Sequence, residues 1–164
     1  MSRSFLPARV RRRLARLLAG GLVATSGVMA LSAAPAEATI TRAQRLDNAL
    51  EIAINQVGDP YRYGSAGPGS FDCSGLLYYS MRKAGFSHFP RTSDAQAGWG
   101  RPVSKSHLRR GDLVFFHHRG DVYHAAIFLR WYHGHAVILH SPRPGDHVRR
   151  DRPWTTEWFA RTGR

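Results

Sequence analysis

A single cysteine, Cys73, is the residue of this chain best suited to nucleophilic chemistry. A glycine-rich segment, residues 64–70, precedes it, and residues 76–84 carry apolar side chains at helical spacing up to Gly85. This pattern predicts that Cys73 lies in the first turn of a helix. Backbone N–H groups and the positive end of the helix dipole favour a thiolate there, so we expect a lowered pKa for the sulfur. The alternative is a small buried side chain without reactivity.

A cysteine nucleophile needs a base that takes its proton and later returns it to the leaving group, and imidazole suits this role near neutral pH. Nine histidines compete for the role. Four of them, His117, His118, His133 and His135, also raise the question of a metal site. Metal-ligand spacings such as H-E-x-x-H are missing, however, and cysteine ligands are lacking. We therefore expect no metal and no other cofactor.

The elements that must position these groups begin with helices. Residues 41–57 carry apolar side chains three and four positions apart, with Gly58 behind them, which is typical of an amphipathic helix with a C-terminal stop. A loop at 90–93 precedes a short helix that ends at Ala97, with a threonine or serine as its cap. We interpret this loop as packing and loop closure rather than as part of the chemistry.

The second half of the chain is predicted to form a sheet. Four apolar or alternating runs, residues 113–116, 124–129, 136–140 and 147–150, are separated by turns that contain glycine or proline. The preceding segment, residues 101–112, has the composition of a basic connector and a turn. Helices followed by an antiparallel sheet indicate an α+β domain.

The first 38 residues have the composition of an export signal. Several arginines are followed by an uncharged stretch, residues 17–36, and by the small-x-small pattern Ala36-Glu37-Ala38 of a signal peptidase site. We expect a signal peptide at 1–38, cleaved after Ala38, and one domain at 39–164. Because of the signal peptide, we expect a secreted protein. An uncleaved N-terminal anchor is the main alternative, and a twin-arginine signal is a weaker one.

Charge and cysteine content narrow the range of partners. The formal net charge is +13, and much of the basic excess remains after the predicted cleavage. Such a surface favours polyanions, and outside the cell these are anionic wall polymers rather than nucleic acid. A basic surface that serves only solubility is the alternative. One cysteine cannot form an internal disulfide, so we expect a free thiol rather than an intermolecular link.

Five segments, taken in order, resemble the NlpC-type family of papain-like cell-wall peptidases. They are residues 58–64, 71–75, 90–96, 111–116 and 124–128, within a resemblance that runs from about residue 45 to residue 150. The D-C-S-G, G-D-L-V-F-F and H-A-A-I-F sequences are specific in combination. The resemblance implies a papain-like fold in which the N-terminal helices, the cysteine helix among them, pack on a small antiparallel sheet.

The resemblance also implies roles for individual residues. Cys73 is the expected nucleophile, His124 the general base and acid, and His140 the polar partner that orients His124. A loop near residues 131–134 would bring positions 124 and 140 nearly opposite each other on neighbouring strands. Because this hairpin is longer than is usual in the family, His135 competes for the third place.

Three further residues match family positions near the nucleophile. The Tyr61 hydroxyl is expected to stabilise the oxyanion together with the Cys73 backbone N–H, with simple packing as its alternative. Asp72 and Ser74 match positions that contact the free amine of the substrate. Asp72 is equally well explained as a helix cap, and Ser74 as a surface hydroxyl.

These expectations define a secreted cysteine peptidase, extracellular or associated with the cell wall. The resemblance implies that the reaction is hydrolysis of an amide in peptidoglycan stem peptides, at the bond between D-glutamate and the diamino acid. We expect a monomer whose partner is peptidoglycan, with no cofactor and no nucleic acid. An amidase or acyl transferase on the same fold, and a non-catalytic wall-binding protein, are the alternatives.

Overall fold

The computed structural model describes residues 39–164. The predicted signal peptide at 1–38 lies outside these residues, so its cleavage and the domain boundary stay predictions. No helix within 39–164 has both the length and the apolar character that a lipid bilayer requires of a spanning segment.

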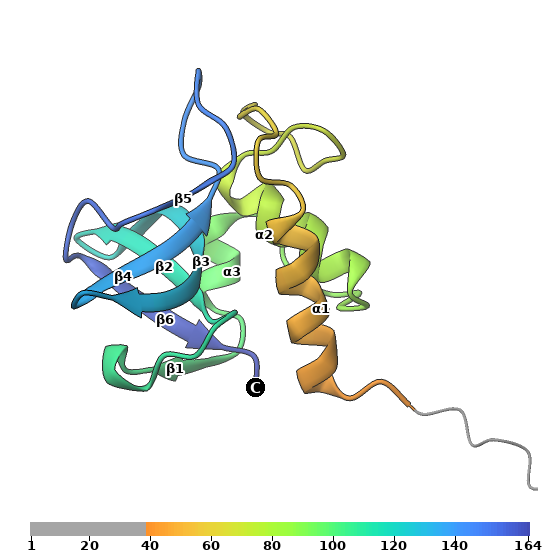
Figure 1. The fold of residues 1–164 in the computed structure, drawn as a ribbon, viewed down its shortest axis with the longest axis horizontal. Coiled ribbons are helices and arrows are strands. Elements are labelled where there is room, and N and C mark those ends of the chain that lie inside the picture. The colour runs from red at the N-terminus through yellow and green to blue at the C-terminus, as the bar shows by residue number, and fades with distance from the viewer. Residues whose placement is uncertain (1–38) are drawn as a thin grey trace, which may run out of the picture. The chain divides into compact units, whose positions relative to one another are not determined.

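Helices come first along the chain and strands follow (Figure 1). The elements are α1 Arg42–Ile54, α2 Cys73–Lys83, α3 Ser93–Ala97, β1 Arg101–Val103, a 3-10 turn Lys105–His107, β2 Leu113–His118, β3 Asp121–Tyr132, β4 His135–His140, β5 Arg149–Asp151 and β6 Trp158–Thr162.

The strands form one antiparallel sheet in the order β1-β6-β2-β3-β4-β5. Helices α1 and α2 lie on one side of it, and their apolar side chains share a core with the sheet face that they cover (Figure 1). The opposite face carries a second apolar cluster that includes Phe116, Phe128 and Ile138. The predicted α+β, papain-like architecture is confirmed.

The sheet is larger than the sequence predicts. Strand β6 lies inside it, between β1 and β2, and pairs Ala160 with Val114. Its burial alternates along the strand, but the arginine and threonine in W-F-A-R-T hide that period from a hydrophobicity pattern. The predicted connector at 101–112 contains β1, an edge strand of three residues in which Pro102 is tolerated.

Helix α1 begins where the sequence predicts and ends earlier. Thr41 Oγ1 accepts a hydrogen bond from the Gln44 N–H (3.2 Å), and the Gln44 side chain accepts one from the Thr41 N–H (2.8 Å), which forms a capping box. The expected extension to residue 57 is wrong, because the helix ends at Ile54 and Val57 is 43 % exposed. The backbone turns instead at Gly58, which has φ +100°. Its N–H donates to the carbonyl of Val148, just before β5.

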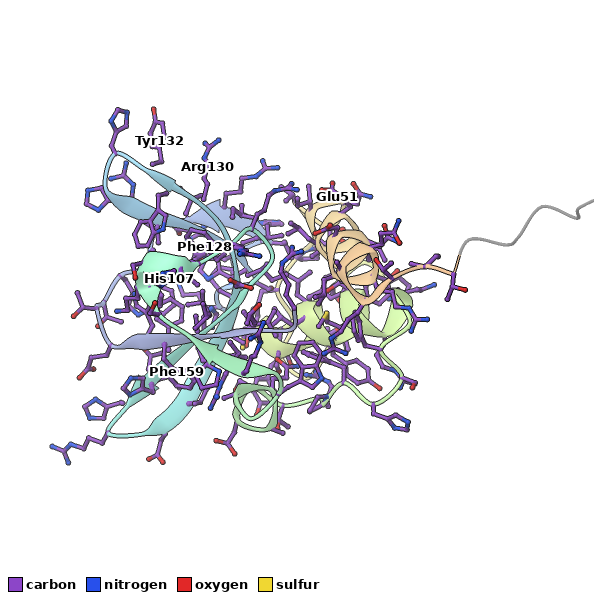
Figure 2. The ribbon with its side chains drawn as sticks, turned by 90° about the horizontal axis from the view of Figure 1, so that it is seen from below. Glu51, His107, Phe128, Arg130, Tyr132 and Phe159 are labelled. Atoms are coloured by element: carbon purple, nitrogen blue, oxygen red, sulfur yellow. The ribbon has the colours of Figure 1, made fainter. Side chains whose placement is uncertain are left out.

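The hairpin that joins β3 and β4 turns at His133 and Gly134, both with positive φ (46° and 75°), as a tight two-residue connection requires. Figure 2 shows Arg130 and Tyr132 on the outward side of this hairpin. His135 pairs with Tyr132 beside the turn and is exposed. The far end of β4, at His140, is buried.

Candidate active site

Cys73 is the first residue of α2, as predicted. Asp72 caps the helix, and its Oδ1 accepts a hydrogen bond from the Gly75 N–H (2.6 Å). A side chain at position 75 would place its Cβ 2.0 Å from the Ser65 carbonyl oxygen, so only glycine allows the loop before Cys73 to cross the helix start. The D-C-S-G sequence thus fixes both the helix start and the loop beside the sulfur.

The sulfur is more enclosed than a helix N-terminus alone implies. Burial has the largest effect and raises the pKa of Cys73, and the charge of Asp72 raises it further. Backbone N–H groups of Ala125, Ser74 and Cys73 itself point at the sulfur and lower the pKa, but they do not outweigh burial. The predicted lowered pKa is therefore wrong, and the resting sulfur is a thiol.

The backbone N–H of Ala125, the residue that follows His124 on β3, points at the sulfur. His124 Nε2 lies 2.9 Å from Nδ1 of His140, at the end of β4, and the two rings are perpendicular. The two side chains are 5 % and 1 % exposed. His140, and not His135 at the other end of β4, is thus the histidine that contacts His124.

The register makes these two histidines diagonal neighbours rather than directly opposite residues. Ile127 pairs with Leu139, so the continuing register sets His140 across from Ala126, two positions from His124. An even offset keeps both histidines on one face of the sheet. The longer hairpin contains a register shift between residues 128 and 130 of β3. This shift changes which residues of β3 and β4 lie opposite each other.

Both imidazoles are neutral in the folded protein. Burial, followed by the proximity of His140, lowers the pKa of His124 to about 3. Burial also lowers the pKa of His140 to about 4, although the charge of Asp151 opposes this effect. A neutral His124 has a lone pair free to accept a proton.

Trp154, which the sequence analysis does not single out, covers the histidine pair. Its ring stacks on Phe116 at a centroid distance of 4.2 Å, and it lies 5.2 Å from the His124 ring and 5.8 Å from the His140 ring. It follows a proline in an irregular segment, where no periodicity marks it. This ring contributes to the burial that keeps the pair neutral.

Arg91 is a second residue whose position the sequence does not predict. Its guanidinium binds the Asp72 carboxylate through two nitrogens, at 2.8 and 3.1 Å, and donates to Ser74 Oγ at 2.9 Å. Asp72 Oδ2 also accepts from the Gly64 N–H at 2.9 Å. Asp72 and Ser74 are each 7 % exposed, so Ser74 is not a surface hydroxyl. The loop assigned to packing therefore reaches the residues on both sides of Cys73.

A pocket of about 510 Å³ opens at the nucleophile. Its lining includes Cys73, Ser74, Tyr61 and Arg91, together with the exposed rings of Tyr63 and Tyr123. Burial, then the neighbouring Cys73 and Asp72, raises the pKa of Tyr61, so its phenol keeps the proton that a hydrogen-bond donor needs. The predicted contact of Asp72 and Ser74 with a substrate amine stays a prediction, as do all the catalytic roles.

Within residues 39–164, no three histidine, cysteine or acidic side chains come close enough together to hold a metal ion. The histidines at 117, 118, 133 and 135 therefore form no cluster in that part of the chain.

A partly exposed cysteine at the start of a helix, in contact with a sheet that also carries a pair of buried histidines, is the arrangement of the papain-like thiol hydrolase class. The family model of NlpC/P60 matches residues 58–163, and the chain belongs to the NlpC/P60 family.

Relatives with endopeptidase names agree with this assignment. The chain is 40 % identical over 100 residues to the probable endopeptidase Rv2190c of Mycobacterium tuberculosis, covering 61 % of this chain and 24 % of the relative. It is 34 % identical over 113 residues to murein DD-endopeptidase MepH of Escherichia coli, covering 63 % and 40 %. The chain therefore spans less than half the length of these two relatives.

A solved structure supports the fold independently. The NlpC/p60 domain of the peptidoglycan hydrolase SagA superposes with a TM-score of 0.63 at 29 % identity, over 71 % of this chain and 97 % of that domain.

Proposed function

We propose that this protein is a cysteine peptidase that hydrolyses an amide bond in peptidoglycan stem peptides, at the bond between D-glutamate and the diamino acid. The observation that carries the proposal is the 2.9 Å contact between His124 Nε2 and His140 Nδ1. It lies on a sheet whose Ala125 N–H, one residue after His124, points at the sulfur at the start of α2. The endopeptidase names of the relatives support the same class of reaction.

In this proposal each ring nitrogen of His124 has its own task. His124 uses Nε2 to contact His140, which leaves Nδ1 to accept the proton of Cys73. The thiolate then attacks the substrate carbonyl. The Cys73 N–H and the protonated Tyr61 hydroxyl donate to the oxyanion, and the His124 imidazolium gives its proton to the departing amine. Water resolves the thioester, with His124 again as the base.

Because the resting thiol has a raised pKa and His124 a lowered one, the thiolate forms by proton transfer within the bound complex. No resident thiolate–imidazolium pair is needed. This ordering predicts little reaction of the free enzyme with thiol reagents at neutral pH.

The remaining parts of the proposal concern location and partners. Secretion through a signal peptide at 1–38 would bring the protein to peptidoglycan, and its basic surface would bind anionic wall polymers there. We propose that it acts as a monomer without nucleic acid or cofactor.

Digestion of purified sacculi tests the proposed reaction. Cys73→Ala and His124→Ala are expected to abolish the release of soluble muropeptides. His135→Ala, which removes an exposed histidine of β4, is the matched control and keeps full activity. Undiminished release by Cys73→Ala would end the hydrolase proposal, and binding of sacculi without any release by the wild type would favour a wall-binding protein.

Mass analysis of the products identifies the bond. A new N-terminus on the diamino acid supports the proposed endopeptidase, whereas a freed lactyl group indicates an amidase. Cleavage of the cross-link would instead match the DD-endopeptidase name of MepH.

A further inference from the structure

His140 carries a buried nitrogen for which the described residues supply no hydrogen-bond partner. Its Nδ1 contacts His124, while its Nε2 is buried and without a partner within hydrogen-bond distance. A buried ring nitrogen that carries a proton needs an acceptor, because water does not solvate it.

The proposed mechanism determines where that proton lies. If His124 accepts a proton from Cys73 on Nδ1, its own proton is on Nε2 and is donated to His140 Nδ1. His140 must then be the tautomer protonated on Nε2. The opposite tautomer would put a proton on His140 Nδ1, leave His124 Nδ1 protonated and block it as a base.

Strand β5 brings one carboxylate to this nitrogen. Asp151 Oδ2 lies 3.8 Å from His140 Nε2, and β5 sets Arg149 opposite His140. The Arg149 guanidinium holds the same oxygen at 3.0 and 3.1 Å, and Asp151 Oδ1 accepts from the Arg152 N–H at 2.8 Å. These contacts hold the carboxylate on the Nε2 side of the imidazole, 3.8 Å from that nitrogen.

On the basis of the proposed function, we propose that Asp151 is a positioning residue: its carboxylate accepts the Nε2 proton of His140 and so selects the tautomer in which His124 Nδ1 is free to act as the base. No proton moves to Asp151. The sulfur proton passes to His124 Nδ1, and the negative charge of Asp151 lies one imidazole away from the positive charge that forms.

The surroundings of His140 favour this role. Burial opposes ionisation of Asp151, but the Arg152 N–H and the Arg149 guanidinium outweigh it and lower its pKa, so the carboxylate is charged at neutral pH. Three charged groups act on the pKa of His140: Asp151 and Asp146 raise it, and Arg149 lowers it. His140 in turn lowers the pKa of His124. A cavity of about 330 Å³, lined by His140, Asp151 and Trp154, gives the carboxylate room to close the remaining distance.

Three variants distinguish selection of the His140 tautomer from a purely structural role of Asp151. Asp151→Ala removes the acceptor. Asp146→Asn is the matched control, since Asp146 is held by the same Arg149 but makes no contact with His140. We expect Asp151→Ala to lower kcat about 10- to 100-fold with KM within about twofold. Asp146→Asn removes only a charge that acts on His140 without a hydrogen bond, so its kcat should stay within about twofold of the wild type. Asp151→Glu, which retains a carboxylate, is expected to recover part of the loss.

The ¹⁵N chemical shifts of the histidine rings at pH 7.5 give a readout independent of turnover. The proposal requires His140 in the wild type to carry its proton on Nε2, and this preference to weaken in Asp151→Ala. A wild-type His140 protonated on Nδ1, or an Asp151→Ala variant with unchanged kcat and tautomer, would overturn it. If the chain releases no muropeptides at all, the proposed function fails, and the tautomer still decides the role of Asp151.

Discussion

The buried histidine pair makes the stability of this protein depend on pH. A single substitution, His140→Gln, measures the part of this dependence that is due to His140. In the unfolded chain a histidine has a pKa near 6.5, whereas burial lowers the pKa of His124 to about 3 and of His140 to about 4. Between the folded and the unfolded pKa values, the histidines are protonated in the unfolded state but not in the folded state. Stability is therefore complete above pH 6.5 and falls as the pH drops toward 4.

The magnitude follows from proton linkage. Each imidazole that is protonated only in the unfolded state contributes a slope of about 1.4 kcal/mol per pH unit. Over the full window the loss is about 3 kcal/mol for His140. Replacing His140 by glutamine removes one titrating group but keeps an acceptor for the His124 N–H. The free energy of unfolding of His140→Gln should then fall about 1.4 kcal/mol per pH unit less steeply between pH 4.5 and 6.

Urea unfolding followed by tryptophan fluorescence, at half-unit steps from pH 7.5 to pH 4.5, measures these slopes. The value at pH 7.5, where both histidines are neutral, serves as the reference for each variant. His135→Gln, on the same strand but exposed, is the control and should keep the wild-type slope. Equal slopes in wild type and His140→Gln would show that His140 titrates normally, which would refute the inference that burial keeps the pair neutral.

Three other perturbations test single contacts. Gly75→Ala forces a Cβ against the Ser65 carbonyl and should lower the free energy of unfolding by ~1–3 kcal/mol in urea denaturation. Arg91→Lys loses the two-nitrogen contact with Asp72, so we expect a loss of ~1–2 kcal/mol by the same assay, and equal stability would contradict the importance of that geometry. Trp154→Ala exposes the histidine pair to water and should raise the pKa values of both, which moves the acidic limb of the pH–kcat/KM profile to higher pH.

Local signals in the sequence predict the elements that carry the candidate residues. The sequence predicts the helix start at Cys73 because a capping residue, a glycine and apolar residues at helical spacing occur within a few positions. Apolar runs between turns that contain glycine predict strands β3 and β4, which carry His124 and His140. Each of these signals depends only on neighbouring residues.

Features that depend on distant contacts were not predicted. Strand β6 is placed by its pairing with β2, about 45 residues earlier in the sequence, and its own composition indicates little. Arg91 and Trp154 act through contacts with residues of α2 and of the sheet. Arg91 lies in a segment that resembles the family, but neither local sequence predicts these contacts. The pKa of Cys73 belongs to the same group, because it is set by what encloses the sulfur.

Burial is the physical cause that joins these features. A helix dipole at an exposed terminus contributes about 0.3–1 kcal/mol, which is less than the cost of holding a thiolate in a largely enclosed site. The same enclosure keeps His124 neutral, so the resting pair is a thiol and an imidazole. In the proposed mechanism, transfer of one proton creates opposite charges on Cys73 and His124, and their attraction in a medium of low polarity offsets much of the cost of desolvating each. In the proposed mechanism the nucleophile is therefore a property of the Cys73–His124 pair with substrate bound, and the position of the cysteine at a helix start does not by itself determine it.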